Sequence, residues 1–165
     1  MCDVLAKYGY VCFTIDYRLF QKEIRPSYPE CAPIAALDIE TARQFIVSKA
    51  DEFGIDPANI SIGGGSAGAM GAIDACRMYP AYKAFVCLWG TYKGAQVPEK
   101  YPPTILIHGT ADKSVPYAYC EAFYAGLQER GIPCELVTLQ DAPHTAISRL
   151  PEYEEPMIRF MNAVM

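Results

Sequence analysis

A short apolar run that passes through a glycine-rich turn into an alanine-rich stretch constrains this chain most. Residues 60–70 read ISIGGGSAGAM, so a strand is predicted to meet a helix at the pattern G-x-S-x-G. In such a turn the central residue, Ser66, takes a strained backbone conformation that lifts its hydroxyl out of the sheet. Gly64 and Gly68 stand two residues either side, where side chains are expected to collide. Ser66 is therefore a candidate nucleophile, although an ordinary glycine-rich turn has the same pattern.

A serine hydroxyl needs a base before it attacks an ester or amide at neutral pH, and histidine is the usual base. The chain contains 2 histidines. His108 ends the apolar run TILIH, a position at which histidine is more often structural than catalytic. His144 lies in the loop QDAPHT after another apolar run. Because a loop side chain can reach across the top of a sheet, His144 is the better candidate base.

The third member of such a site is a carboxylate that orients the imidazole and stabilises the imidazolium. Asp112 follows the run at residues 104–108 and suits this role. Taken alone, Asp112 is better explained as a cap for a helix that begins near Pro116. Asp141 is closer to His144 in sequence, but two residues of one short loop seldom face each other as the chemistry requires. Asp112 is therefore the candidate acid.

The order Ser66, Asp112, His144 is the order of an α/β-hydrolase triad. The chain resembles the esterase and lipase group of that family, which includes carboxylesterases and acetyl-xylan or feruloyl esterases. The resemblance spans nearly the whole chain and implies these three residues as the triad. It rests on DYRL at residues 16–19, GIDP at 54–57, SAG at 66–68, HGTAD at 108–112 and PH at 143–144.

The resemblance also implies an N-terminally truncated version of the fold. Relatives carry an HGGG-type loop after their third strand that forms part of the oxyanion hole, and this sequence has no counterpart of it. The backbone N–H of Ala67, at the positively polarised start of a helix, remains as the other expected donor.

In the family's sheet order the absent strand lies between the runs at residues 10–16 and 60–63. Three outcomes are open: the first run shifts inward to pair with the second, another chain completes the sheet, or the sequence is a fragment. We favour the fragment, with a homodimer as the way in which its exposed strand edge stays soluble.

Strand-like runs alternate with helical patterns along the chain. The strands are expected at residues 10–16, 60–63, 84–89, 104–108 and 134–139, and the helices at 33–53, 67–79, 117–130 and 152–164. This alternation predicts an α/β protein, a single domain over residues 1–165 with a mostly parallel sheet and helices on both faces. Active sites of such sheets form at the carboxyl ends of the strands, and all three triad candidates follow strand ends. The connection 91–103 is too short for a large lid domain.

Charge and hydrophobicity exclude several classes of partner. The chain is 52% hydrophobic, which suits a folded core, and its net charge of -5 argues against nucleic acid and acidic membrane surfaces. No apolar stretch approaches the length of a membrane span. The N-terminus shows no secretion signal, so a cytoplasmic location is expected, or a secreted one if the start is truncated.

The 7 cysteines contain no C-x-x-C pair and no zinc-like spacing, so neither a metal nor another cofactor is expected. Cys12, Cys87 and Cys134 fall in apolar runs, where cysteine behaves as a small buried hydrophobe. This usage suits a reducing compartment. A separate group of charged residues, Asp16, Arg18 and Asp38, is expected to form structural pairs.

These observations predict a serine hydrolase that cleaves carboxylic esters, with small acyl esters or acyl groups on carbohydrates as substrates. Gly65, Trp89, Tyr92 and Tyr101 lie near the predicted strand ends, where they are candidate substrate contacts, although such aromatics more commonly pack in the core. Two alternatives stay open. One is a peptidase with the same triad, and the other is a catalytically impaired fragment or interaction module that lacks part of the oxyanion hole.

Overall fold

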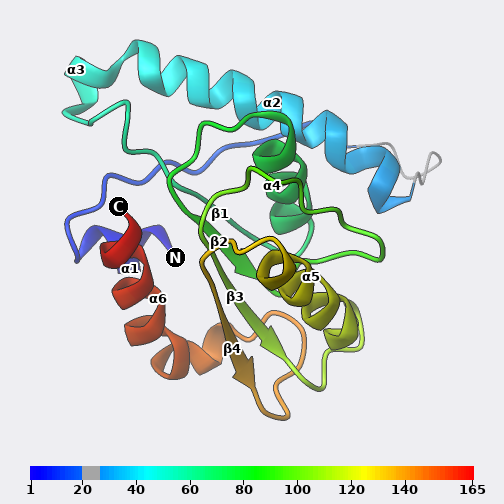
Figure 1. Ribbon diagram of the computed structural model, residues 1–165. Helices are drawn as coiled ribbons and strands as arrows, with labels where there is room; N and C mark the ends of the chain where they lie inside the picture. The colour runs from blue at the N-terminus through cyan, green and yellow to red at the C-terminus, as the bar shows by residue number, and fades with distance from the viewer. Residues whose placement is uncertain (20–26) are drawn as a thin grey trace.

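A four-stranded parallel sheet forms the centre of the computed structural model, which describes residues 1–19 and 27–165 (Figure 1). The strands are β1 (Ile62–Gly65), β2 (Phe85–Leu88), β3 (Thr104–Gly109) and β4 (Cys134–Leu139). They lie in the order β1-β2-β3-β4, and each neighbouring pair is parallel. Helices connect β1 to β2 and β3 to β4, and this parallel sheet with its helices confirms the predicted α/β class.

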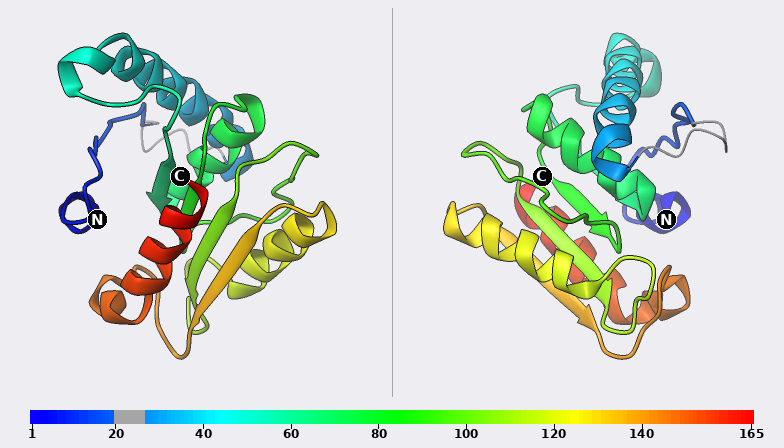
Figure 2. Two further views of the ribbon diagram at one scale, coloured as in Figure 1. Left: turned by 60° about the vertical axis from the view of Figure 1, so that its left-hand side comes forward. Right: turned by 90° about the vertical axis from the view of Figure 1, so that its right-hand side faces the viewer.

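Helices cover both faces of the sheet (Figure 2). One face packs against α4 (Ala67–Met78) and α5 (Tyr117–Glu129), and the other packs against α6 (Leu150–Val164). The side chains of β2 alternate accordingly, with Phe85 and Cys87 toward α4 and α5 and Val86 and Leu88 toward α6. Both β2 and β3 are buried along their whole length, which explains why they read as continuous apolar runs.

The remaining helices lie beside the sheet. The long helix α2 (Tyr28–Ser48) packs along α4 and is followed by the short α3 (Ala50–Phe53). A short helix, α1 (Cys2–Ala6), lies near α6, and a single 3-10 turn, η1 (Ile147–Arg149), precedes α6. Between β2 and β3, residues 89–103 contain no helix or strand.

The strand predicted over residues 10–16 is not formed. A strand needs a neighbour for its backbone groups, and β1, toward which this segment runs, pairs only with β2 among the described residues. Of the three open outcomes, the inward shift of this segment to pair with β1 is therefore not observed. Instead, Arg18 anchors it to α2, where its Nε and Nη2 lie 3.0 and 2.8 Å from Asp38 Oδ1. This confirms the predicted pairing of Arg18 with Asp38, whereas Asp16 forms no ion pair with a described residue.

The helix predicted from residue 33 begins earlier, at Tyr28, and is divided in two. Ser27 precedes it, and both its backbone N–H and its hydroxyl donate to the Glu30 carboxylate at 2.7 Å. This capping interaction fixes the start of α2 ahead of Pro33, the first residue of the predicted range. The second piece, α3, is terminated by the residue that follows it, Gly54, whose φ of 64° only glycine adopts readily.

Candidate active site

Ser66 lies in the sharp turn between β1 and α4, as the sequence predicts. Its φ of 52° and ψ of -122° are a strained combination for a residue with a side chain. Gly64 makes the turn possible, because a Cβ on it would lie 2.5 Å from the backbone carbon of Gly68. The prediction that Gly68 itself is sterically required is wrong, since a Cβ there would meet no atom within 4 Å. Steric crowding therefore requires glycine at position 64 but not at position 68.

Gly90, the second residue after β2, also shapes the turn, and sequence analysis missed it. A Cβ on Gly90 would lie 2.3 Å from the carbonyl oxygen of Ser66 and 2.3 Å from the Cβ of Ala69. The preceding residue, Trp89, has a positive φ of 40°. A glycine that directly follows an apolar strand was the available signal, because it marks a close approach of two backbones.

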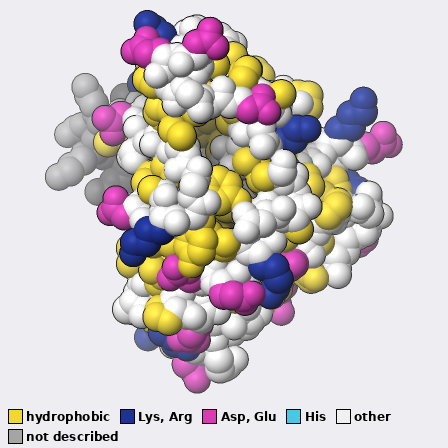
Figure 3. Space-filling view, turned by 90° about the vertical axis from the view of Figure 1, so that its left-hand side faces the viewer, with side chains coloured by type: hydrophobic (Ala, Val, Ile, Leu, Met, Phe, Trp, Pro, Cys, Tyr) yellow, Lys and Arg dark blue, Asp and Glu magenta, His cyan; other side chains and the backbone are white. Residues whose placement is uncertain are grey.

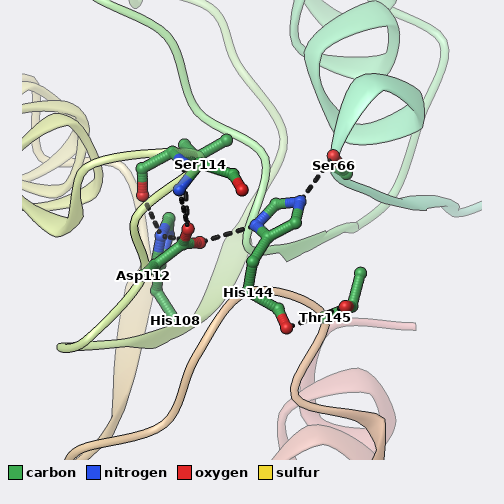
Figure 4. Close-up of polar contacts among 7 residues, drawn as sticks. Ser66, His108, Asp112, Ser114, His144 and Thr145 are labelled. Carbon is green, nitrogen blue, oxygen red and sulfur yellow. Dashed lines mark hydrogen bonds and ion pairs between the residues drawn. The ribbon is translucent and has the colours of Figure 1, made fainter.

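The structure brings Ser66, His144 and Asp112 together at the carboxyl ends of β1, β3 and β4 (Figure 4). The Ser66 Oγ lies 2.9 Å from His144 Nε2, and His144 Nδ1 lies 2.7 Å from Asp112 Oδ2. The Asp112 side chain is 0% exposed and the His144 side chain is 21% exposed. The acid is therefore shielded from water while the base remains open to an incoming molecule.

These contacts fix where the protons lie. The Asp112 carboxylate only accepts, so neutral His144 carries its proton on Nδ1 and donates it to Oδ2. Nε2 is then free to accept the hydrogen bond from the Ser66 hydroxyl. This is the tautomer that a general base facing a serine nucleophile requires.

Asp112 is not a helix cap, because α5 begins at Tyr117 and its N-cap is Pro116. The backbone N–H groups of Ser114 and Val115 instead donate to Asp112 Oδ1 at 2.8 and 2.9 Å. Burial raises the pKa of the Asp112 carboxyl, but the hydrogen bonds from Val115, His144 and Ser114 outweigh it, so its pKa lies below its usual value. Asp112 therefore stays ionised beside the base.

His108 is a second partner of the acid, which the sequence suggested only as a structural residue. It is buried, and its Nε2 lies 3.1 Å from Asp112 Oδ2 and 3.0 Å from the Val115 carbonyl oxygen. Since a carbonyl oxygen only accepts, the His108 proton lies on Nε2 and is shared between the two oxygens. Burial lowers the pKa of His108, against the raising effects of Val115 and Asp112, and keeps the ring neutral. The spacing H-x-x-x-D was the signal for this contact.

The loop that carries the base is also strained. Asp141 and Thr145 have φ values of 56° and 53°, on either side of His144. The Asp141 N–H donates to Thr110 Oγ1 at 2.8 Å, and the Gln140 side chain donates to the Asp141 carboxylate at 3.3 Å. Asp141 therefore shapes the loop, and the geometry agrees with Asp112 rather than Asp141 as the acid.

The predicted substrate contacts are packed into the protein rather than directed at the triad. Trp89 is buried and meets Tyr153 edge to face, with ring centres 6.2 Å apart. The Tyr92 hydroxyl donates to Asp74 at 2.9 Å, and the Tyr101 hydroxyl donates to the carbonyl oxygen of Ile73 at 3.2 Å. Gly65 lies against Trp89, since a Cβ on it would lie 3.2 Å from the indole Nε1. These contacts give no support to stacking on a substrate.

The described residues offer neither a cluster of metal ligands nor a membrane-spanning helix. Residues 1–19 and 27–165 hold no group of three or more His, Cys, Asp or Glu side chains suited to a metal ion. Over the same residues, no helix has the length and apolar character needed to cross a membrane. Of the cysteines expected to be buried, Cys87 is buried, whereas Cys12 and Cys134 are half-buried.

Two protein families match consecutive parts of the chain. The family described as BD-FAE matches residues 1–76, and the prolyl oligopeptidase family matches residues 88–165. A curated relative, the bis(hydroxyethyl) terephthalate hydrolase of Streptomyces coelicolor, is 30% identical over 124 residues, which are 74% of this chain. The match spans 38% of that relative's length.

Solved structures resemble the whole described fold. An α/β-hydrolase from a Medee basin deep-sea metagenome library superimposes with a TM-score of 0.84 at 17% identity, covering 99% of this chain and 75% of its own. The acetyl ester-xyloside bifunctional hydrolase of Caldicellulosiruptor lactoaceticus gives 0.80 at 18% identity, with the same coverage of both chains. Esterase 2 of Thermogutta terrifontis gives 0.68 at 21% identity, covering 90% of this chain and 69% of its own.

The parallel sheet, the strained serine turn and the order of the three site residues agree with these matches. The chain therefore has the α/β-hydrolase fold, and its sequence is similar to esterase-like proteins of that fold.

Proposed function

We propose that this chain is a serine hydrolase of carboxylic esters, acting on small acyl esters or on acyl groups carried by carbohydrates. The observation that carries the proposal is the continuous path of hydrogen bonds from Ser66 through His144 to the buried Asp112, at 2.9 and 2.7 Å. The names of three similar proteins, a terephthalate hydrolase, an acetyl ester-xyloside hydrolase and an esterase, point to the same bond type.

The first half of the reaction forms an acyl-enzyme. His144 Nε2 takes the hydroxyl proton as Ser66 Oγ attacks the ester carbonyl, and Asp112 stabilises the imidazolium that results. His144 then passes that proton to the departing alcohol. In the second half, His144 takes a proton from the water that attacks the acyl-serine, and returns it to Ser66 Oγ as the acid is released and the free serine is restored.

The negative charge that develops on the carbonyl oxygen needs a donor. The Ala67 N–H is in the first turn of α4, where backbone donors have no partner inside the helix. The partial positive charge of a helix N-terminus adds to the effect. An oxyanion hole ordinarily has two or more donors, and loss of one typically lowers turnover about 100-fold to 1000-fold. We therefore expect slow but measurable turnover from the chain alone.

An open site favours small substrates. Residues 89–103 carry no helix that would form a lid, and the His144 ring is 21% exposed. A short acyl group on a larger alcohol or sugar requires little enclosure and therefore suits such a site.

A peptidase is the second candidate, because residues 88–165 match the prolyl oligopeptidase family. The same triad cleaves both bond types, and peptides differ in having a poorer leaving group. The order of rates on an acetate ester and an aminoacyl anilide therefore separates the two candidates.

The test is hydrolysis of p-nitrophenyl acetate by the wild-type chain and by Ser66→Ala, with alanine p-nitroanilide as the second substrate. The proposal expects ester turnover that falls to background in the variant, a loss of up to about a million-fold, and no comparable anilide turnover. Faster anilide cleavage would favour the peptidase. Equal ester rates in the two proteins would overturn the catalytic proposal and leave the non-catalytic alternative.

A further inference from the structure

The two histidines of the chain meet at one carboxylate oxygen. Asp112 Oδ2 lies 2.7 Å from His144 Nδ1 and 3.1 Å from His108 Nε2, and Figure 4 shows the carboxylate between the two rings. The proposed reaction uses only the first of these contacts. The His108 side chain is as buried as the acid itself, with exposed fractions of 1% and 0%. A buried histidine that touches the acid but takes no part in the chemistry needs an explanation of its own.

The support of the acid does not come from β1. Figure 3 looks onto the free edge of that strand and shows hydrophobic side chains gathered around a hollow, with no histidine in view. The residues of β1 between Ile62 and Ser66 are Gly63, Gly64 and Gly65. They have no side chains with which to hold the acid, so any support from the sheet has to come from another strand.

The donors to Asp112 fall into two groups. Oδ1 accepts from the backbone N–H groups of Ser114 and Val115, at 2.8 and 2.9 Å, and both belong to the acid's own loop. These bonds fold the loop around the carboxylate, but they move with it. Oδ2 accepts from His144, which itself has to be oriented, and from His108, which belongs to β3. Of these four donors, His108 is the one that ties the carboxylate to the sheet.

His108 is itself fixed from several sides. Its backbone lies in β3, opposite Thr138 of β4. Its Nε2 proton is shared between Asp112 Oδ2 and the Val115 carbonyl oxygen, at 3.1 and 3.0 Å, so one ring holds the loop at two points. Tyr117 packs against this ring edge to face, with ring centres 5.8 Å apart, and its hydroxyl lies 2.6 Å from that of Thr138. These contacts hold the ring with its N–H directed at the acid.

The base depends on the place of the acid. If the carboxylate turned away, His144 Nδ1 would lose its acceptor, and the imidazole could carry its proton on Nε2 instead. In that tautomer it cannot accept the proton of Ser66. We propose that His108 is a positioning residue of this site: by donating to Asp112 Oδ2 from β3, it holds the acid where the acid keeps His144 in the reactive tautomer.

Two substitutions separate the N–H donor from the ring. His108→Leu removes the donor and keeps a buried side chain, whereas His108→Gln places an amide N–H the same number of bonds from the backbone as Nε2. On p-nitrophenyl acetate, kcat should fall at least about tenfold in the leucine variant, with KM within about threefold of wild type. The glutamine variant should restore kcat to within about threefold of wild type. Should His108→Leu not fold, His108→Asn replaces it, because its amide is one carbon too short to reach Asp112.

A second measurement needs no substrate. The chain contains 2 histidines, so in isotope-labelled protein the His144 ring nitrogens are readily identified by nuclear magnetic resonance, and in each His108 variant they are the only ones. Wild type and His108→Gln should show the proton on Nδ1, and His108→Leu a mixture of the two tautomers. The inference rests on the proposed function, but this spectrum does not. An inactive wild type would refute the hydrolase proposal, while the tautomer of His144 would still test the role of His108.

Thr104→Val is the matched control for stability. Thr104 is buried at the other end of β3, and its hydroxyl donates to the Pro102 carbonyl oxygen at 2.8 Å. The substitution therefore removes a buried hydrogen bond from the same strand without touching the acid. It should leave both kcat and the His144 tautomer unchanged.

Three results would overturn the proposal. The first is a wild-type tautomer of His144 in His108→Leu, whatever its rate, because the effect would then not pass through the acid. The second is an equal loss of kcat in His108→Leu and His108→Gln, which would assign the effect to the packing of the ring. The third is an equal loss in Thr104→Val, which would assign it to the stability of β3.

Discussion

The two edges of the sheet are built differently. On β4, Glu135 pairs with Arg159 of α6 at 2.9 Å, and the Thr138 hydroxyl lies 2.6 Å from that of Tyr117. On β1, which reads IGGG, the edge has no polar side chain and faces an apolar groove. Charged and polar side chains near an edge make it compatible with water and discourage pairing with other strands. The β4 edge is therefore compatible with exposure to solvent, whereas the β1 edge has the apolar character of a covered strand.

The active site combines residues that follow both edge strands of the sheet. Asp112 and His144 come from the loops after β3 and β4, where buried hydrogen bonds from Ser114, Val115 and His108 hold the acid. Ser66 comes from β1, whose other side is the groove. Among the described residues, β1 pairs with β2 alone, so the strand that leads to the nucleophile has a strand partner on one side only.

The largest expected effect tests the β3 and β4 side. Asp112→Asn removes the charge that stabilises the His144 imidazolium and allows the wrong tautomer, so ester turnover should fall about 10,000-fold. Rates on p-nitrophenyl acetate measure the effect. The matched control is Asp141→Asn, in the neighbouring loop, which should keep its rate within about threefold. A comparable loss in both variants would break the assignment of Asp112 as the only acid.

The next largest effect tests the β1 side through its glycines. Gly64→Ala forces a Cβ to 2.5 Å from backbone atoms, so the free energy of unfolding should fall by about 3 kcal/mol. Gly68→Ala is the matched control, because it meets no atom within 4 Å and gains helix propensity of up to about 1 kcal/mol. Urea unfolding measures both. Equal losses would mean that the turn after β1 is less crowded than the structure shows.

A smaller effect concerns pH. Burial lowers the pKa of His108 in the folded chain, so below about pH 6.5 the unfolded chain binds a proton that the folded chain does not. The free energy of unfolding should therefore fall as the pH drops below that value. His108→Gln retains an N–H donor near Asp112 but does not titrate, so its unfolding free energy should fall less between pH 7.5 and pH 5.5. Parallel urea series measure this, and equal slopes would contradict it.

The accuracy of the strand predictions also differs between the two sides of the sheet. The strands predicted at residues 104–108 and 134–139 agree with β3 and β4 to within a residue. Each is a largely apolar run, and the two strands pair with each other in the sheet. The run at residues 10–16 has the same composition, yet it forms no strand. Composition reports that a segment suits a buried sheet, but pairing depends on a neighbour that is distant in sequence.

The site shows the same division between local and distant information. The G-x-S-x-G turn and the chain order of the triad are local signals, and the three residues that they point to, Ser66, Asp112 and His144, lie within hydrogen-bond distance of one another in the structure. The contact of Gly90 with Ser66 arises where two loops meet, so the sequence around either residue does not contain it. The burial of Trp89 against Tyr153 is likewise set by α6, which lies more than sixty residues further along the chain.

The smallest effect returns to the β4 edge. Glu135→Gln removes its ion pair with Arg159, and both side chains are well exposed, at 40% and 56%. Exposed pairs contribute less than about 1 kcal/mol, so urea unfolding should change little. The edge comparison predicts a different consequence, since loss of a charge removes protection against strand pairing. Light scattering at increasing protein concentration should therefore detect more association in Glu135→Gln than in Glu121→Gln, a matched change on α5. Equal association would mean that the β4 edge is kept open by something other than this charge.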